Sequence, residues 1–443
     1  MQTPQLPTGK QMLKVVDPRC QRVFTRKLTH ATSVCLHCGP TRTLRSCHPA
    51  GGNSSAVASV LSSHSTQANA AFQTFRFTAL GLRPRIGAAT RYEQACCSDV
   101  IFLSFRYQIM ETFKAFRVHT VGGKPVCKFE QLTIDDIDPG PVVIRTAFAG
   151  ITYKDAMAAR GVGKNVRTDR PAVTGTDLSG VVVSSEDDRF KEGDHVAVTN
   201  YQLGNLHDGA YADYARVPAE WVVPLPTGLS LYEAMALGTS GLTAALAVQR
   251  LENAGLNPGD GPIAVTGATG GVGSLAVDML AKKGYEVVAI SGKTDQVDFL
   301  KSIGAARVLA RDDFMKDKSP LVSSPPFAGA LDNVGGAMLD RLAANVMPHG
   351  KVAIAGMVAV EVTTTVLPFV LRSVDILGLN VSRQLKMPER RRLWERMATD
   401  LKPNHLDKIA RPVPFVELDN SMDRFFKVSM VGRVVVEVGS KAP

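Results

Sequence analysis

The stretch Ile263-Ala-Val-Thr-Gly-Ala-Thr-Gly-Gly-Val-Gly-Ser-Leu-Ala-Val-Asp-Met-Leu280 decides the fold class of this chain. It begins as a short apolar strand, passes through a cluster of glycines and ends with the periodicity of a helix. Gly267, Gly270 and Gly273 fall at every third position. The first permits a tight turn, the second lets a phosphate group approach the backbone, and the third lets the helix pack closely on the strand. The stretch therefore predicts a strand, turn and helix that bind the pyrophosphate of a dinucleotide at the start of the helix.

The residues after the next strand indicate which dinucleotide binds. Residues 285–290 predict that strand, and an NAD-selective site places a carboxylate directly after it for the ribose 2′-hydroxyl. This chain has Ser291, Gly292 and Lys293 there instead. A hydroxyl, a free N–H group and a cation bind a 2′-phosphate, which a carboxylate would repel. We therefore expect NADPH rather than NADH, the alternative for Lys293 being a solvated lysine at the start of a helix.

The net charge of +10 belongs to the N-terminal part of the chain. Of the 51 Lys/Arg and 41 Asp/Glu residues, the first 109 positions hold 13 and 3, which leaves 38 of each for the remainder. A nucleic-acid-binding domain is expected to carry its own basic face, so the neutral remainder argues against a nucleic-acid partner. The sequence contains no run of 18 or more apolar residues, and we therefore expect no membrane span.

Residues 1–110 differ in composition from the rest of the chain. They are rich in Ser, Thr, Arg and Ala, poor in acidic residues, and without helical or alternating periodicity. This composition is typical of an organellar transit peptide. A disordered extension, or a gene model that begins too early with Met110 as the real start, are the alternatives.

The cysteines are also concentrated in this N-terminal segment. Six of the seven lie there, and Cys35, Cys38, Cys47 and the adjacent His48 have the spacing of zinc ligands but no predicted folded context. Cys127 alone remains for the body, where it has no partner for an internal disulfide. A single cysteine that cannot form an internal disulfide is consistent with a reducing compartment. We expect a cytoplasmic protein, or one in a mitochondrion or plastid if the extension is a transit peptide.

The remainder divides into three segments. Residues 113–235 contain short strands with turn signals, and residues 236–366 alternate strands and helices. Such alternation predicts an α/β fold with a doubly wound parallel sheet, preceded by a helix over 231–250. Residues 367–443 are mixed and end in a strand, 432–438, that we expect to return to the β-rich domain. A ligand would then lie between the domains, at the carboxyl ends of the parallel strands.

A run of charged residues, Glu389-Arg-Arg-Arg392, follows Pro388 at the start of a helical stretch. Charged runs on amphipathic helices usually face solvent. We therefore expect this run to be a solvated face.

Many short motifs along the body resemble one family in the same order. They are Tyr153-Lys-Asp155, Gly175-Thr-Asp-Leu-Ser-Gly180, Ser185-Glu-Asp-Asp-Arg-Phe190, Gly238-Thr-Ser-Gly-Leu-Thr-Ala244, Val265-Thr-Gly-Ala-Thr-Gly-Gly-Val-Gly273, Ser291-Gly-Lys293, Arg311-Asp-Asp-Phe314, Thr364-Thr-Val-Leu-Pro-Phe369 and Gly432-Arg433. Residues 113–440 thereby resemble the medium-chain dehydrogenase/reductase superfamily, and more closely its zinc-free quinone-oxidoreductase branch of the acrylyl-CoA reductase (AcuI/YhdH) type. The resemblance implies a GroES-like catalytic domain, a Rossmann domain that binds NADPH, and a homodimer.

The resemblance also assigns site residues. It implies that Tyr153 contacts the cofactor near its reacting end. The pyrophosphate would be bound by Thr269, Gly270, Gly271 and Val272, and the 2′-phosphate by Ser291, Gly292, Lys293 and Arg311. Two positions depart from the family pattern, because Lys293 replaces a frequent arginine and Thr152 a frequent asparagine. The body lacks the cysteine and histidine cluster of the zinc-dependent branch, so we expect no metal.

The reaction implied by the resemblance is NADPH-dependent reduction of the C=C bond of a 2-enoyl-CoA such as acrylyl-CoA. A phenol hydroxyl can donate to a developing enolate and a carboxylate can orient it, which makes Tyr153 and Asp155 the catalytic candidates. The alternatives are that Tyr153 only packs on the nicotinamide and that Asp155 caps the helix that follows. For the protein as a whole, the alternatives are an NADPH:quinone or enone reductase and, more distantly, a non-enzymatic NADPH-binding protein.

Overall fold

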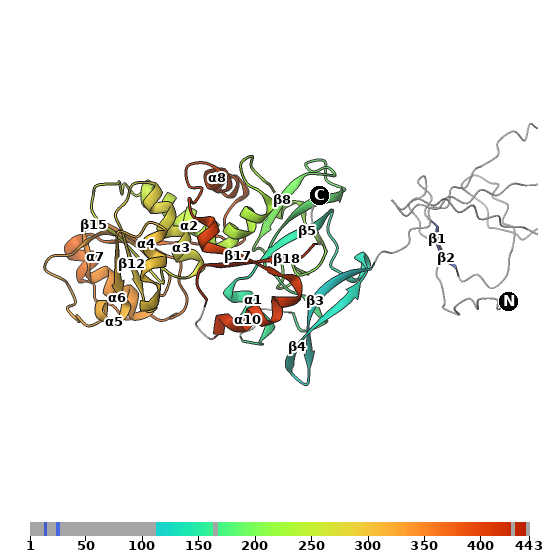
Figure 1. Cartoon of the computed structure of the whole chain (residues 1–443), viewed down its shortest axis with the longest axis horizontal. Coiled ribbons are helices and arrows are strands. Elements are labelled where there is room, and N and C mark those ends of the chain that lie inside the picture. Colours follow the sequence, from blue (N-terminus) through green and yellow to red (C-terminus); the bar gives the residue numbers. More distant parts are fainter. Residues whose placement is uncertain (1–12, 16–23, 27–111, 163–166, 427–429, 440–443) are drawn as a thin grey trace, which may run out of the picture. The chain divides into compact units, whose positions relative to one another are not determined.

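The structure is a computed structural model that describes residues 13–15, 24–26, 112–162, 167–426 and 430–439 (Figure 1). The chain forms two compact units, Met1–Met110 and Glu111–Pro443. In the first unit, β1 (Leu13–Val15) pairs antiparallel with β2 (Phe24–Arg26). Apart from these two strands, the predicted transit peptide lies outside the described residues, as do Cys35, Cys38, Cys47 and His48. All further elements belong to the second unit.

A six-stranded parallel sheet forms one half of the second unit. Its order is β13-β12-β11-β14-β15-β16, and every neighbouring pair is parallel. The strands are β11 (Ile263–Thr266), β12 (Val287–Ser291), β13 (Arg307–Ala310), β14 (Phe327–Asp332), β15 (Val346–Ile354) and β16 (Asp375–Gly378). In chain order this is 3-2-1-4-5-6, the Rossmann arrangement, which confirms the predicted doubly wound sheet.

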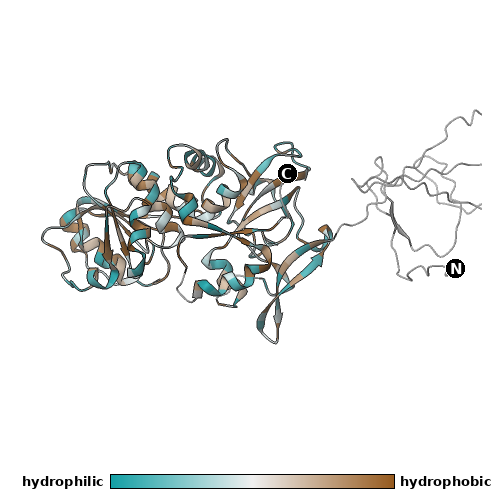
Figure 2. Cartoon of the chain, viewed as in Figure 1, coloured by the Kyte–Doolittle hydropathy of each residue, from teal (hydrophilic) through white to brown (hydrophobic). Residues whose placement is uncertain are grey.

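The central strands of this sheet are mostly hydrophobic (Figure 2), and they are buried throughout because helices cover both faces of the sheet. Ile263 and Val265 of β11 belong to a core with α2 (Leu231–Asn253) and α3 (Gly271–Lys282), whereas Ala264 belongs to a second core with α6 (Gly336–Ala344). Alternate residues of one strand therefore face opposite helical layers. The shorter helices of this half are α4 (Val297–Ser302), α5 (Arg311–Phe314) and α7 (Leu367–Arg372).

The predicted helix over 231–250 is confirmed as α2, but it is broken within its length. A capping box starts it, in which Ser230 and Glu233 each accept the other's backbone N–H. Gly238 then has φ 49° and ψ −150°, outside helical geometry. By length and composition α2 could cross a membrane, yet 78% of its most apolar window is buried inside the protein.

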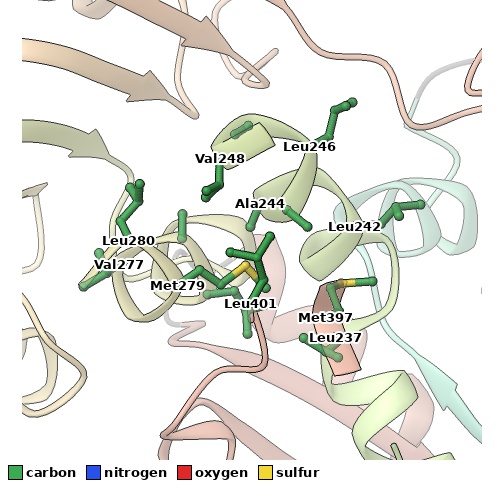
Figure 3. Close-up of a cluster of buried hydrophobic side chains, with 14 of the residues drawn as sticks. Leu237, Leu242, Ala244, Leu246, Val248, Val277, Met279, Leu280, Met397 and Leu401 are labelled. Carbon is green, nitrogen blue, oxygen red and sulfur yellow. The ribbon is translucent and has the colours of Figure 1, made fainter. Parts of the chain in front are cut away.

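The apolar side chains of α2 pack against α3 and α8 (Met387–Ala398) (Figure 3). Leu237 and Leu242 of α2, Met279 of α3 and Met397 of α8 are all at most 1% exposed. This cluster places α2 against the parallel sheet on one side and the β-rich half on the other.

The β-rich half contains two antiparallel-dominated sheets. The larger has the order β10-β8-β7-β5-β18-β17, with β9 also paired to β5, and the smaller has the order β4-β3-β6. Their strands are β3 (Phe113–Val121), β4 (Lys124–Leu132), β5 (Val142–Gly150), β6 (Ala172–Val173), β7 (Asp177–Ser185), β8 (His195–Thr199), β9 (Tyr214–Val217), β10 (Val223–Pro224), β17 (Ala410–Pro414) and β18 (Arg433–Glu437). The C-terminal strand lies in the larger sheet, where β18 pairs with β5. The helices here are α1 (Tyr153–Ala159), α9 (Leu406–Ile409) and α10 (Leu418–Phe426).

Two expectations need correction. The parallel sheet continues past the expected boundary at residue 366, because β16 is its sixth strand. The charged run is not wholly solvated: Arg391 and Arg392 are exposed, but Arg390 is fully buried. Its guanidinium donates to the Thr199 hydroxyl at 3.0 Å and the Val381 carbonyl at 2.8 Å. A buried guanidinium is tolerated where its N–H groups find acceptors, and helical periodicity alone does not reveal such acceptors.

Candidate dinucleotide site

The turn between β11 and α3 has the backbone shape that the glycine spacing predicts. Gly267 has φ +56°, and its carbonyl accepts the Gly270 N–H at 2.9 Å. Gly270 is the N-cap of α3, without a side-chain cap. The first N–H groups of an α-helix have no partner within the helix, so those of α3 are available to an anion. Gly273 cannot be larger, since an added Cβ would lie 2.4 Å from the Gly267 carbonyl oxygen.

This turn lies where the strand order reverses. β11 has β12 on one side and β14 on the other, so the turn opens at the topological switch point of the sheet. At the end of β14, the buried Asp332 carboxylate accepts the Thr266 hydroxyl at 2.6 Å and the Gly335 N–H at 2.8 Å. Asp332 thereby ties the ends of β11 and β14 together. Sequence reasoning missed it, although a carboxylate at the end of an apolar strand was a usable signal.

The structure brings three of the four residues expected at the 2′-phosphate together. Ser291 is the last residue of β12, and its hydroxyl accepts the Lys293 N–H at 3.0 Å. Gly292 lies against Arg311, because a Cβ at this glycine would be 3.0 Å from an Arg311 guanidinium nitrogen. The Arg311 side chain is 54% exposed and is paired with Asp312 at 2.8 Å. A hydroxyl and an exposed guanidinium therefore flank one short turn.

The sequence position of Lys293 suggested either a ligand of the 2′-phosphate or a solvated lysine, and its position in the structure differs from both. It is half-buried, and its ammonium group donates to the Met430 carbonyl at the approach to β18. Burial lowers the pKa of this lysine. The fully solvated alternative is therefore wrong, and the ammonium group is already engaged by the protein.

Tyr153 and Asp155 have distinct positions at the start of α1. Tyr153 is the first residue of the helix and is 52% exposed. Asp155 is 1% exposed and accepts the Thr152 N–H at 2.7 Å, the Thr152 hydroxyl at 2.6 Å and the Thr176 N–H at 3.0 Å. Burial raises the pKa of Asp155 to about 6. Asp155 thus forms a capping box with Thr152, the arrangement that the helix-cap alternative describes.

A second buried acid, Asp177, lies at the start of β7 and was not predicted as a site residue. It accepts both the N–H and the hydroxyl of Thr239, just after the break in α2. Arg433, at the start of β18, lies 3.9 Å from it. Both residues occur in the family-like motifs, but the sequence does not show that they meet, because they are far apart in the chain.

The described residues do not assemble the donors of a zinc site. No group of three or more His, Cys, Asp or Glu side chains with suitable geometry occurs among them. Cys127, half-buried, donates to the Ala159 carbonyl at 3.4 Å, and burial raises its pKa to about 11. A thiol with such a pKa is a poor metal ligand, since the thiolate is the binding form. The zinc of the wider superfamily therefore does not fit this donor set.

Family models match both halves of the second unit. The alcohol dehydrogenase GroES-like domain matches residues 138–227, and the zinc-binding dehydrogenase domain matches residues 271–399. Acrylyl-CoA reductase AcuI of Ruegeria pomeroyi is 40% identical over 319 residues, covering 72% of this chain and 96% of the relative. The chain belongs to the medium-chain dehydrogenase/reductase superfamily, in its AcuI/YhdH/YhfP group. As a member of this superfamily it is a nicotinamide-dinucleotide-dependent oxidoreductase.

Other relatives of the same group were named for a different activity or crystallised with different cofactors. The Bacillus subtilis protein named "Putative quinone oxidoreductase YhfP" is 44% identical over 309 residues, covering 69% of this chain and 93% of the relative. A crystal structure of Bacillus subtilis YhfP with NAD has 42% identity and a TM-score of 0.71, covering 74% of this chain and 99% of that one. Escherichia coli YhdH, crystallised with NADPH, has 38% identity and a TM-score of 0.70, covering 73% and 100%. The predicted family, Rossmann sheet and GroES-like domain are therefore confirmed.

Proposed function

We propose that this chain reduces the C=C bond of a 2-enoyl-CoA with NADPH, acrylyl-CoA to propanoyl-CoA being the reaction that its relatives favour. The supporting observation is the 40% identity to AcuI of Ruegeria pomeroyi over 96% of that relative, with the probable Escherichia coli AcuI at the same identity. NADPH:quinone or enone reduction is the second candidate, supported by the 44% identity to YhfP.

NADPH fits the residues at the switch point. The first N–H groups of α3 and the glycine turn from Gly267 to Gly273 would hold the pyrophosphate, because Gly270 caps α3 without a side chain and leaves those N–H groups available to an anion. Ser291, Gly292 and Arg311 would hold the 2′-phosphate through charge-assisted hydrogen bonds. When bound, NADPH supplies the hydride that the reduction requires.

The residues of the β-rich half act on the substrate. Negative charge builds on the thioester oxygen as the β-carbon is reduced, and a donor at that oxygen stabilises it. The half-exposed Tyr153 is our candidate donor, and its hydroxyl could also supply the proton to the α-carbon. Asp155 is better suited to holding the start of α1, because its oxygens already accept hydrogen bonds from Thr152 and Thr176.

Initial rates with acrylyl-CoA, crotonyl-CoA and a quinone under saturating NADPH test the proposal. We expect the highest kcat/KM with acrylyl-CoA. A higher value with the quinone would replace the first candidate by the second. Absence of turnover with all three would reject both substrate classes.

We also propose a homodimer that forms through the free edge of β16. β16 ends the parallel sheet, so one side of its backbone has no strand partner within the described residues. Exposed large apolar side chains gather on and before this strand: Met357, Val358, Val360, Val362, Val366, Val370, Leu371 and Ile376. Such a patch is typical of a protein interface. In light scattering, we expect a dimer that Ile376→Arg converts to a monomer, while Val416→Arg, at an exposed site outside the patch, leaves it intact.

The location of the enzyme is proposed to be cytoplasmic, with the organellar location as the outcome if residues 1–110 direct import. A fusion of residues 1–110 to a fluorescent protein distinguishes the two. A chain that starts at Met110 should retain full activity, since the related proteins match 69–72% of this chain over nearly their whole lengths.

A further inference from the structure

Arg433 is buried at the junction of three segments that build the two ends of the site. It is 3% exposed, and its guanidinium donates to the Met235 carbonyl at 3.1 Å and the Ala236 carbonyl at 3.2 Å. It also donates to the Ile151 carbonyl at 3.0 Å and the Ser240 hydroxyl at 3.1 Å. Burying a guanidinium is costly unless its N–H groups are partnered, and these four acceptors meet that requirement.

The partners of Arg433 explain how α2 tolerates its break. In a continuous helix the Met235 carbonyl would accept the N–H of Thr239. At Gly238 the helix is interrupted, and the Thr239 N–H donates instead to Asp177 at 2.7 Å, while Arg433 donates to the Met235 carbonyl. Asp177 therefore accepts from the donor, and Arg433 donates to the acceptor, of the helical hydrogen bond that the break removes.

Arg433 is also in contact with the phosphate-binding turn. A Cβ added to Gly271, in the first turn of α3, would lie 2.9 Å from Arg433 Cδ and 3.1 Å from the Ser240 hydroxyl oxygen. The neighbouring Gly432 N–H donates to the Thr269 carbonyl at 2.8 Å. On its other side, Arg433 holds the Ile151 carbonyl, two residues before Tyr153. One side chain thus lies between the turn and the start of α1.

We propose that Arg433, fixed by Asp177 and the broken α2, is a positioning residue that sets the phosphate-binding turn against the start of α1. It thereby fixes where the nicotinamide end of the cofactor lies relative to Tyr153. The proposal rests on the proposed NADPH-dependent function, because it concerns the same site. Arg433 itself touches neither the reacting atoms nor the 2′-phosphate residues.

If Arg433 positions the cofactor, its replacement should weaken the binding of NADPH but not that of adenosine 2′-monophosphate. NADPH spans the turn and the reacting end, whereas adenosine 2′-monophosphate needs only the Ser291 and Arg311 region. Arg433→Lys keeps the charge but not the fork of N–H groups that reaches four acceptors. We expect it to weaken NADPH binding by about 10-fold and to lower kcat by a similar factor, with unchanged affinity for adenosine 2′-monophosphate. Titration of NADPH fluorescence, with displacement by the nucleotide, measures both affinities without turnover.

Arg372→Lys is the matched control. Arg372 is 9% exposed and donates to the Ala344 and Val346 carbonyls, at the end of the sheet opposite the turn. This variant should have a lower thermal stability, but its affinity for NADPH should not fall relative to its affinity for adenosine 2′-monophosphate. If Arg433→Lys does not fold, Ser240→Ala decides the question, because it removes one acceptor of Arg433 and should weaken NADPH binding by about threefold.

These measurements distinguish failure of the positioning role of Arg433 from failure of the proposed NADPH-dependent function. Folded variants with unchanged NADPH affinity and kcat, or with equal losses for both ligands, would overturn the positioning role. Failure of the unmodified protein to bind NADPH would instead overturn the proposed function.

Discussion

The phosphate-binding turn and the start of α1 belong to the same site, but the turn uses backbone groups and the start of α1 uses side chains. The turn presents backbone N–H groups and relies on the absence of Cβ atoms at Gly267, Gly270 and Gly273. The start of α1 presents side chains, namely the exposed Tyr153 and the buried Asp155. A backbone site depends on glycines at fixed spacing, whereas a side-chain site can change its substrate by single replacements. Relatives of the same group can therefore carry different substrate names.

The comparison predicts that one added methyl group at the turn has the largest effect. Gly273→Ala would place a Cβ 2.4 Å from the Gly267 oxygen and 2.7 Å from the Ala268 Cα, and neither backbone atom can move alone. We expect NADPH affinity to fall by at least about 100-fold, because α3 must shift from the turn. Gly378→Ala is the control, since a Cβ there meets no atom within 4 Å. Equal affinities of the two variants would show that the turn tolerates side chains.

At the other end, removal of one hydroxyl should affect catalysis rather than cofactor binding. Tyr153→Phe keeps the ring, so NADPH affinity should change little. If the hydroxyl stabilises or protonates the enolate, kcat with acrylyl-CoA should fall by about 100-fold. Stopped-flow single turnovers separate this step from product release. An unchanged kcat would make Tyr153 a packing surface for the nicotinamide.

The buried carboxyl group of Asp155 predicts a pH dependence of stability. Burial raises the pKa of Asp155 to about 6, so between pH 4 and 6 the folded protein binds this proton more tightly than the unfolded chain. Unfolding free energy should therefore fall as pH rises through this window, by up to about 3 kcal/mol, and level off above it. Asp155→Asn should lose this slope in urea titrations between pH 4 and 7. An identical slope in the variant would assign the dependence to another group.

The contrast between backbone groups and side chains also determines how much of the fold and site the sequence could predict. The parallel sheet follows from local signals, namely the apolar run at Ile263, the glycine spacing and the alternation after it. Arg390 and Arg433 could not be placed, because some of their acceptors lie as far as 191 and 282 residues away in the chain. Lys293 was assigned from its position after β12, yet its ammonium group meets the Met430 carbonyl, 137 residues later. Backbone sites are encoded locally, whereas buried polar side chains depend on tertiary partners.

The choice between NADPH and NADH is the smallest effect and tests the one part of the cofactor site that uses side chains. Relatives with about 40% identity were crystallised with NADPH and with NAD, so the shared fold does not determine this choice. Arg311 is exposed and water competes for its hydrogen bonds, so Arg311→Ser should raise KM for NADPH by only about 10-fold and leave KM for NADH unchanged. Lys293→Met should change the preference less, because its ammonium group is bound to the Met430 carbonyl. Steady-state kcat/KM for both cofactors provides the measurement. If the unmodified protein used NADPH and NADH equally well, Ser291 and Arg311 would not form a 2′-phosphate site.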